Sequence, residues 1–450
     1  MRILQHHNKG SALVVVMIFV AVFGALALGY LASVNASLQS AKIQAESTRA
    51  LAAAESGLAF ARAELPMLRL LTTPVNTPQS LQKIADELNT RLGATLFGGA
   101  RATVNGDSVL LPTIILDFPE GPASFQVMLK ATGGDTLTVR SVGARGEARK
   151  CVTAQFSAAE DNRLLTQFGV ASRSRIVMKG NAIIDGANDP LEGSVLSTNQ
   201  VSLEPIDITG HVNISGNAAI SNPGGNVSLR GNSEIGGDIM IGVQEPPFPE
   251  IDVSLFEPYA VNRLDPNVHT YSSDVYLENI RIPANTNPTF TANTMICGTV
   301  YIESPNQVTF SGNLVLIGTI VAAPAVGGLE DNYIKFTGNS TTLPVSTLPA
   351  SARFAGLRAL DGSLLLAPGY HVEFSGSFAT LHGSIVASKM GFTGDATGTI
   401  RGSILNYEDT DFEVSGSSHL TIDHSNLDDA PGGMRFPRRL VYVGGTYGEP

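Results

Sequence analysis

The sequence is poor in charged and aromatic residues, and it contains no tryptophan. Charged residues make up 15% of the 450 residues, against about 25% in a typical soluble domain. The formal net charge is −11, and the sequence has no run of Lys and Arg that could neutralise a row of phosphates. These features argue against a nucleic-acid-binding protein, so we expect no nucleic acid among the partners.

Cysteine and the common catalytic motifs are also scarce. The two cysteines, Cys151 and Cys297, fit no metal-ligand spacing. They could form one disulfide in an oxidising compartment, but two buried thiols are the favoured alternative. The sequence contains no phosphate-binding loop, no GxSxG and no HExxH. We therefore expect no catalytic residue, no metal and no cofactor, and we predict that the protein is not an enzyme.

Glycine and hydrophobic residues, in contrast, are plentiful. The chain has 46 glycines, about a tenth of its residues, whereas the average is near 7%. Hydrophobic residues make up 43%, which excludes a disordered composition. This balance favours a mainly β chain with many tight turns, and the length allows two or three domains.

The N-terminus consists of a mildly basic leader, residues 1–10, followed by a long apolar run. The stretch Ser11–Ala32 is almost wholly apolar. As a helix it would span roughly 33 Å, enough to cross the hydrocarbon core of a membrane. A cleaved secretory signal is the rival interpretation, but its apolar core would be only about 7–15 residues long. Because Arg2 and Lys9 precede the run, we expect a cytoplasmic N-terminus and a chain that lies mostly on the far side of the membrane.

The helical pattern continues beyond the apolar run. The segment Val34–Leu65 is rich in Ala, Leu, Gln, Glu and Arg, and it contains no proline before Pro66. We therefore predict one helix over residues 11–65 that begins in the membrane and continues into water. A stripe for packing on a neighbouring helix is predicted from spacings of mostly three, four and seven at Leu38, Ala41, Ala45, Leu51, Ala52, Leu58 and Arg62. The alternative is an ordinary membrane anchor followed by a spacer helix.

Two short motifs in this region resemble the N-terminal region of type IV pilins and pseudopilins, in particular the PilX-type minor pilins and the tip pseudopilins of type II secretion. The first is the end of the leader, Lys9-Gly10-Ser11-Ala12-Leu13, and the second is Ala52-Ala53-Ala54-Glu55-Ser56-Gly57-Leu58. The resemblance covers about 60 residues. It implies that prepilin peptidase cleaves after Gly10 and leaves Ser11 as the new N-terminus. It further implies assembly with other pilin-like subunits through the helix, including Val14, Leu38, Glu55, Gly57 and Leu58.

The sequence departs from this family at two positions. The family usually has Phe as the first mature residue and Glu as the fifth, whereas the mature form of this chain would begin with Ser11 and has valine at the fourth and fifth positions, Val14 and Val15. A carboxylate in the membrane requires a partner, which in the family is thought to be the terminal ammonium of the adjacent subunit. The tip and initiation subunits of the family also lack this Glu. Valine at Val14 and Val15, with no Glu, therefore favours a tip or priming role over that of a repeating shaft subunit.

Residues 66–160 read as a small α/β module. Ser80 is the expected cap of a helix over Leu81–Leu92, which Gly93 ends. Alternating stretches then predict an antiparallel meander packed against the helix, as in pilin-like domains. The expected strands are Ser108–Phe118, Ala123–Ala131, Thr136–Gly143 and Glu147–Phe156.

Residues 165–427 repeat a short pattern of a hydrophobic residue, a polar residue, Gly and a small polar residue. It begins at positions 178, 214, 229, 310, 336, 374, 392 and 414, and a second element begins at 237, 318, 383 and, more loosely, 402. Short strands between Gly-Asn corners suit a right-handed parallel β-helix, or solenoid. The alternative fold is a β-sandwich. Residues 428–450 contain an expected strand over Arg439–Val443, read as a terminal cap or tail.

Candidate chemical groups in the repeat region are sparse. The tight acidic groups are Glu330-Asp331 and Glu408-Asp409-Thr410-Asp411, and we interpret both as solvated turns. His419 and His424 flank Asp423, but in a strand residues 419 and 424 point to opposite faces, which disfavours a shared metal site. A β-helix also supports polysaccharide-active enzymes and adhesins, so an exported adhesin or glycan-active enzyme on a signal anchor remains the alternative. In either case a solenoid face could contact a glycan or a surface protein.

The sequence as a whole predicts a mainly β protein with a long N-terminal helix, anchored in a bacterial inner membrane and carrying a β-solenoid. The expected function is that of a structural pilin-like subunit, a minor or tip component of a type IV pilus or of a type II secretion pseudopilus. Its expected partners are the membrane, prepilin peptidase and other pilin-like subunits.

Overall fold

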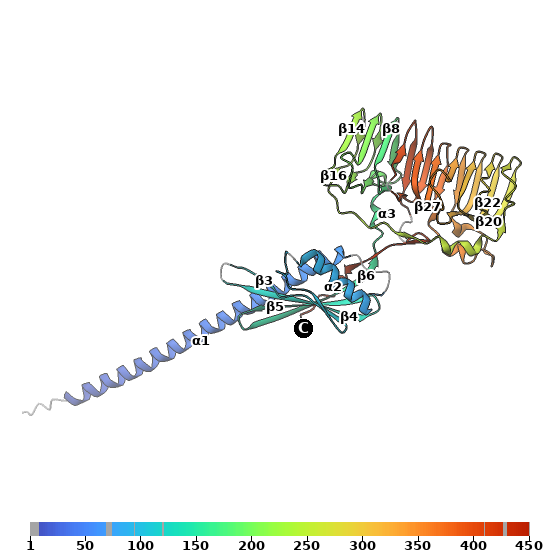
Figure 1. Cartoon of the computed structure of the whole chain (residues 1–450). Helices are drawn as coiled ribbons and strands as arrows, with labels where there is room; N and C mark the ends of the chain where they lie inside the picture. The colour runs from blue at the N-terminus through green and yellow to red at the C-terminus, as the bar shows by residue number, and fades with distance from the viewer. Residues whose placement is uncertain are drawn as a thin grey trace, which may run out of the picture. The chain divides into compact units, whose positions relative to one another are not determined.

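The structure, a computed structural model, describes residues 9–68, 74–93, 95–118, 121–408, 410–425 and 430–449. The chain divides into two compact units (Figure 1). The first, which we call the helix–sheet unit, comprises Met1–Ala159 and Arg438–Pro450. The second, the solenoid unit, comprises Glu160–Pro437. The solenoid unit is therefore inserted in sequence between two parts of the helix–sheet unit.

One long helix and one antiparallel sheet make up most of the helix–sheet unit. Helix α1 runs over Lys9–Glu64, and the one-turn 3₁₀ helix η1 (Leu65–Met67) follows it at the predicted proline. Helix α2 spans Pro78–Leu92. The sheet order is β1-β2-β4-β5-β6-β35, with β3 beside β4. Its strands are β1 (Thr103–Asn105), β2 (Ser108–Leu110), β3 (Ile114–Leu116), β4 (Ala123–Gly133), β5 (Thr136–Arg145), β6 (Ala148–Glu160) and β35 (Arg438–Tyr442).

Details at three of these elements differ from the sequence prediction. The N-cap of α2 is Thr77, whose hydroxyl accepts from the backbone N–H of Ser80, because Pro78 begins the helix three residues earlier than expected. The expected strand over 108–118 is two strands, β2 and β3, separated at Pro112. The C-terminal strand does not cap the repeat region. β35 instead extends the antiparallel sheet beside β6, where Val443 N donates to Gln155 O at 2.9 Å.

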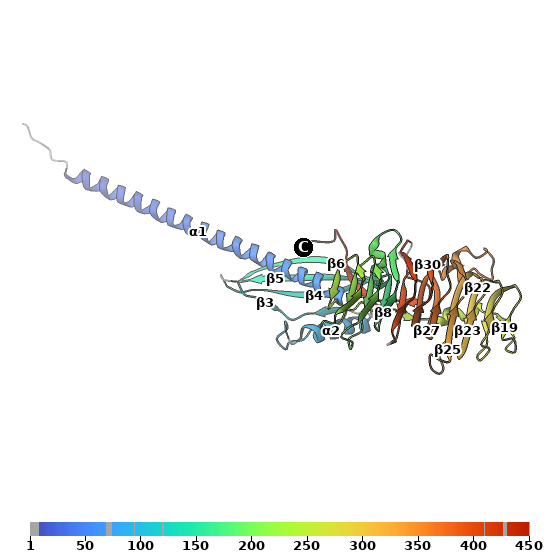
Figure 2. The same cartoon turned by 90° about the horizontal axis from the view of Figure 1, so that it is seen from above.

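The solenoid unit is a stack of coils with three strands in a complete coil, and each strand pairs in parallel with its equivalents in neighbouring coils (Figures 1 and 2). Parallel ladders of this kind rule out the β-sandwich alternative, whose sheets would be antiparallel. The predicted β-solenoid is confirmed, and its right hand stays a prediction. We refer to the three ladders of strands as the first, second and third faces.

The first face contains the strand that opens each coil. In stack order its strands are β16 (Ile239–Ile241), β13 (Ala218–Ile220), β10 (Val195–Ser197), β7 (Val170–Ser172), β31 (Ile404–Asn406), the first parts of β29 (Ser384–Phe392) and β27 (Ser363–Phe374), the last parts of β24 (Leu314–Ala322), β22 (Thr294–Ile302) and β20 (Val275–Ile282), and β18 (Asn262–Arg263).

The second face contains the strand with the repeated corner motif. In stack order its strands are β14 (Val227–Gly231), β11 (Ile206–Gly210), β8 (Ile176–Gly180), β32 (Phe412–Val414), the last parts of β29 and β27, β25 (Asn332–Phe336), β23 (Asn306–Phe310), β21 (Thr289–Phe290) and β19 (Thr270–Tyr271).

The third face closes each coil. Its strands are β15 (Glu234–Ile235), β12 (Asn213–Ile214), β9 (Ile183–Gly186), β33 (His419–Asp423), β30 (Thr397–Arg401), β28 (Thr380–His382), β26 (Ser340–Leu343) and the first parts of β24, β22 and β20. The short elements outside the three faces are α3 (Arg163–Gln167), η2 (Pro190–Gly193), β17 (Glu250–Ile251), η3 (Val253–Leu255), η4 (Glu257–Tyr259), η5 (Val345–Thr347), η6 (Leu357–Ala359) and β34 (Met434–Arg435).

The order of the coils in the stack differs from their order in the sequence. The first coil, β7–β9, lies inside the stack and pairs with β10–β12 on one side and with β31–β33 on the other. From β9 the chain builds coils outward to β16. Residues 243–261 then lead to β18, from which the chain returns coil by coil until β31–β33 meet the first coil. The stack is thus a permuted solenoid that the chain enters and leaves at the same place.

Aromatic rings fill the interior along the second face. Tyr271, Phe290, Phe310, Phe336, Phe374 and Phe392 occupy one register position in successive coils. Neighbouring rings in this series are stacked, with centroids 4.5–5.3 Å apart and interplanar angles of 6–14°. The ladder continues at the same position through Val414, Met178, Ile208 and Leu229.

This ladder explains the repeat found in the sequence. Seven of the eight predicted motifs begin at a ladder position, and the four copies of the second element place Ile239, Ile320, Ile385 and Ile404 on the first face. The motif at position 214 is the exception, because Ile214 lies on the third face between Ile184 and Ile235. Tyr271, Phe290 and Ile208 also occupy ladder positions, but they are not followed by the full motif, so the sequence pattern did not predict them.

The outward side of the first face is covered by segments that leave the stack. Residues 243–261, which connect β16 to β18, are called the crossing segment. Its buried side chains, among them Phe248, Val253 and Phe256, pack on this side together with Leu357 and Phe436. β17 in the crossing segment also pairs with β34 near the exit from the solenoid. The proline-rich crossing segment therefore covers the apolar outward side of the first face.

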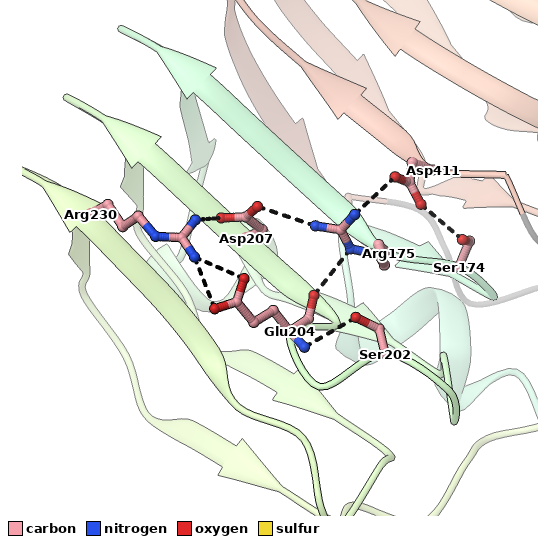
Figure 3. Close-up of polar contacts among 7 residues, drawn as sticks. All are labelled: Ser174, Arg175, Ser202, Glu204, Asp207, Arg230 and Asp411. Carbon is pink, nitrogen blue, oxygen red and sulfur yellow. Dashed lines mark hydrogen bonds and ion pairs between the residues drawn. The ribbon is translucent and has the colours of Figure 1, made fainter.

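A network of charged side chains joins the first coil that the chain forms in the stack to the last one (Figure 3). Arg175, between β7 and β8, is 3.1 Å from Asp207 on β11 and 3.5 Å from Asp411, which precedes β32. Arg230 on β14 contacts Asp207 at 2.6 Å and Glu204 at 2.8 Å. Hydrogen bonding to Arg230 lowers the pKa of Glu204. Arg175 thus links the last coil of the returning chain to the first and second coils.

Candidate functional site on helix α1

The N-terminal half of α1 is apolar and exposed on all sides within this chain. Leu13–Met67 contains an apolar window long enough to cross a membrane, and none of that window is buried. Met17, Phe19 and Phe23 are 67%, 58% and 65% exposed. Exposed side chains this apolar in a continuous patch mark a membrane or protein contact. Among the described residues this is the one helix with these properties.

The predicted processing site lies at the start of this helix. Lys9, Gly10 and Ser11 are helical in the backbone, and their side chains lie outside the described part. Val14 follows on the apolar segment and is 56% exposed. Leu38, farther along, is 63% exposed and remains free to contact another molecule.

The C-terminal half of α1 packs on the sheet through small residues. Ala50, Ala53, Ala54, Gly57 and Ala61 are all buried against the sheet side of the helix. A Cβ atom at Gly143 of β5 would lie 2.1 Å from Ala50 O and 2.3 Å from Ala54 N. Glycine at this position therefore allows the helix backbone to contact the strand directly.

Gly57 has an equivalent role on the helix side. A Cβ atom there would lie 2.2 Å from Ser141 Oγ and 2.7 Å from Phe125 Cδ2. The neighbouring Leu58 is 3% exposed and belongs to the core of the helix–sheet unit. Gly57 and Leu58 are thus used inside this chain, which corrects their predicted role as contacts to other subunits. The glycine is required because helix and sheet approach too closely for a side chain.

Of the stripe predicted to pack on a neighbouring helix, Leu58 is buried inside this chain, whereas Leu38, Ala41, Ala45, Ala52 and Arg62 are exposed, and their contact with a neighbour stays a prediction. The seam with the chain's own sheet lies on other residues, and its spacing of three, one, three and four from Ala50 to Ala61 was a usable signal in the sequence. Gly143 and Ser141 on β5 carried no such signal, because their role depends on the helix that lies against them.

Glu55 points away from the sheet and is exposed. Its Oε1 accepts a hydrogen bond from Tyr447 Oη at 3.4 Å, which links the C-terminal segment to the helix. The guanidinium of Arg62 lies 3.8 Å from the centroid of the Tyr442 ring in the same region. The C-terminal segment therefore supports the packed half of α1.

The other candidate groups lie apart from the helix. Cys151 on β6 and Cys297 on β22 are free thiols in different units. Asp331 accepts from Gly328 N in a turn, and Asp411 belongs to the network around Arg175; Asp409 lies outside the described residues. Among the described residues no group of three or more His, Cys, Asp and Glu could hold a metal ion.

The two histidines near Asp423 do not form a common site. His419 bonds Asp185 at 3.0 Å, and His424 lies 3.3 Å from Ser403 Oγ, where burial lowers its pKa. Burial alone would raise the pKa of Asp423, but hydrogen bonds from Ser425, Arg401 and Asn188 outweigh it and lower the pKa to about 2. Asp423 is therefore an ionised structural carboxylate that joins β33 to β30 and to the loop after β9.

Comparisons with known proteins give a likeness at the level of structure. No family model matches the chain, and no curated protein sequence matches it. Among solved structures, the crystal structure of the competence-associated pilin ComZ from Thermus thermophilus is similar at 13% identity, covering 90% of this chain and 98% of that chain, with a TM-score of 0.31. A likeness at this level does not by itself assign a fold or a function.

Proposed function

We propose that the protein is a non-enzymatic, membrane-anchored pilin-like subunit that displays a β-solenoid outside the cytoplasm. The observation that carries this proposal is the division of α1, which has a wholly exposed apolar half and a half packed on its own sheet. An apolar half of this length requires a membrane or other helices around it. The leader ending at Gly10 and the motif around Glu55 resemble those of pilins and pseudopilins.

Within that class we propose a minor or tip position, in a type IV pilus or a type II secretion pseudopilus of the bacterial inner membrane. Val15, next to Val14, stands where shaft subunits of the family carry Glu, so this chain cannot pair a buried carboxylate with the terminal ammonium of the next subunit. The inserted solenoid unit, Glu160–Pro437, is also a large addition for a subunit that repeats along a narrow filament. The N-terminus is proposed to be cytoplasmic and the remainder periplasmic or extracellular.

N-terminal sequencing of the protein purified from its native membrane tests this proposal. We expect a mature chain that begins at Ser11 and still fractionates with the membrane or with filaments. A Gly10→Glu variant should keep Met1, because it changes the residue after which the peptidase is expected to cut. Wild-type protein that keeps Met1 would overturn the pilin-type assignment, and a cut well beyond Ala32 would indicate a secreted soluble protein.

A charge placed in the exposed half of α1 tests the role of that half. Phe19→Lys puts an ammonium near the centre of the apolar run, which costs about 2.5–3.5 kcal/mol for membrane insertion. We expect it to reduce membrane association without changing the fold of either unit. Leu38→Lys is the matched control, because it lies beyond the run and should stay anchored. Equal retention of Phe19→Lys and wild type would contradict the proposal.

A further inference from the structure

A shallow groove lies on the outward side of the second face, over β23, β25, β27 and β29. Its volume is about 470 Å³, and its lining includes Gln307, Tyr333, His371 and Lys389. These four residues share one register position, because Gln307 pairs with Tyr333, Tyr333 with His371, and His371 with Lys389. Leu329 and Glu330, in the loop before β25, also line the groove. The solenoid therefore presents a row of four polar or aromatic side chains along its axis.

The spacing of this row is set by the backbone. Neighbouring strands lie about 4.8 Å apart, so the row offers one side chain at every such step. That step is close to the length of one pyranose ring in a linear polysaccharide. A chain of sugar rings laid along the axis would therefore meet a new side chain at each ring.

The two central side chains contact each other, and Tyr333 is also bonded to a neighbouring carboxylate. The rings of Tyr333 and His371 are in edge contact, with centroids 4.7 Å apart. Tyr333 Oη donates to Glu373 Oε2, and Glu373 is also 3.3 Å from Lys335 and accepts from Thr393 at 3.2 Å. Burial, followed by the positive charge of Lys389, lowers the pKa of His371 to about 4. The floor of the groove at neutral pH is thus a fixed, uncharged aromatic pair that can contact a sugar ring and bond its hydroxyls.

Within the row itself Lys389 is the one charged side chain, and it lies at the opposite end from Gln307 and from Glu330 of the lining. Lys389 is half-buried, and no described carboxylate lies within the 4.0 Å of an ion pair with its ammonium. Lys335, in contrast, is already paired with Glu373. At the other end, Gln307 donates to Glu330 O at 2.7 Å, which orients its amide along the groove. The row therefore combines hydroxyl-bonding groups with one cation suited to a carboxylate.

We propose that this groove binds a linear acidic oligosaccharide of the hexuronate class, with its rings along Gln307, Tyr333 and His371 and a ring carboxylate on Lys389. This proposal does not depend on the assembly role of α1. A subunit displayed at a cell surface would gain from it a contact with an acidic glycan. The groove is proposed as a binding site and not as a catalytic one.

Calorimetric titration of the detergent-solubilised full chain tests the proposal with three probes, namely oligogalacturonate, oligoalginate and hyaluronan fragments. We expect at least one of them to bind. Polyglutamate, which has the carboxylates without the rings, and methyl-esterified oligogalacturonate, which has the rings without the charge, should bind much more weakly. Absence of binding by all three probes would overturn the proposal, as would equal binding of polyglutamate.

Substitutions then locate the site. Lys389→Gln should weaken binding about tenfold or more, because it removes a charged hydrogen bond. His371→Gln should also weaken it, because it removes the ring contact. The matched control is Lys179→Gln, an exposed lysine on β8 of the same face outside this row, and it should leave the affinity unchanged. If Lys179→Gln and Lys389→Gln had equal effects, binding would be a general charge effect and the groove would not be the site.

Discussion

The two units bury their apolar residues by different means. In the helix–sheet unit, one helix lies on one antiparallel sheet, and the contact depends on a few small residues such as Gly57 and Gly143. In the solenoid unit, each coil lies on the next, and equivalent residues stack through the whole interior, as the phenylalanine ladder does. The first contact is specific to single positions, whereas the second is repeated in every coil.

This difference determines how far a local change should spread. A side chain added at Gly143, in the seam between helix and sheet, would overlap backbone atoms of α1 that lie directly opposite. A ring removed from the ladder leaves a cavity between two neighbours that belong to other coils. The effect of a substitution should therefore be measured by a method that reports on each segment of the chain separately, such as hydrogen exchange measured peptide by peptide.

The largest effect is expected for Phe374→Ala. The Phe374 ring is fully buried, with its centroid 4.5 Å from that of Phe336 and 5.2 Å from that of Phe392. Its removal should cost about 3–5 kcal/mol of unfolding free energy and raise exchange in both adjacent coils. Phe118→Ala is the control, because that ring is 49% exposed in the other unit. Equal losses for the two variants would show that the ladder is not a source of stability.

A smaller but sharply placed effect is expected for Gly57→Val. The added side chain would overlap Ser141 and Phe125, so the helix must move from β4 and β5 at a cost of about 1–3 kcal/mol. Exchange should rise in β4 and β5 and stay unchanged in the solenoid unit. Ala52→Val on the exposed side of α1 should cost well under about 1 kcal/mol. A similar loss in both variants would mean that helix propensity, and not the seam, is responsible.

Acid should weaken the solenoid through Asp423. Its pKa is lowered to about 2 in the folded state, against about 3.9 in the unfolded chain. The stability it provides is therefore full above about pH 4 and is lost as the pH falls toward 2, on the order of 1–2 kcal/mol after allowance for solvent screening. Unfolding measured from pH 5 to 2 should show this loss, and Asp423→Asn should flatten it. An unchanged pH slope in the variant would contradict the assignment.

The smallest effect is expected at the junction of the permuted stack. Arg175→Met removes the contacts to Asp207 and Asp411 and should cost about 1 kcal/mol, because these groups are partly exposed. Exchange should rise in β32 and β8 before it rises in β25 and β27, which carry the stacked rings of Phe336 and Phe374. Arg263→Met is the control. Its side chain is 59% exposed on the outermost strand, and its ion pair with Glu303 is long at 3.6 Å. Greater exchange at β18 than at the junction would argue against a closing role for Arg175.

The local elements were largely predictable from the sequence. The end of α1 before Pro66, the core of α2, the strands β4 to β6 and most of the solenoid corners follow from periodicity, proline and the Gly-Asn pattern. Each of these signals is read within a few residues, because the physical cause is local. The apolar half of α1 is the clearest example, since length and composition alone indicate a membrane helix.

The pairing of distant segments was not predictable. The same corner motif occurs at Met178 and at Val414, and nothing in either copy says that these two coils are neighbours. Likewise, Arg438–Tyr442 reads as a strand but does not reveal that its partner is β6. The seam on the helix was visible as the motif around Gly57, yet Ser141, which faces Gly57, and Gly143, which faces Ala50 and Ala54, lie far away in the sequence. Register and neighbour choice depend on the whole stack, so local patterns leave them open.

The permuted order of the coils has a consequence for a chain that is synthesised from its N-terminus. Coil β7–β9 emerges early, but one of its edges is completed only by β31–β33, where Asn406 bonds Ser172 across 234 positions of sequence. Until those residues arrive, three parallel strands present open edges, the kind of surface that recruits other β chains. Closure of the stack thus joins the segments that lie farthest apart in the sequence, and it has to wait for the last coil to be synthesised.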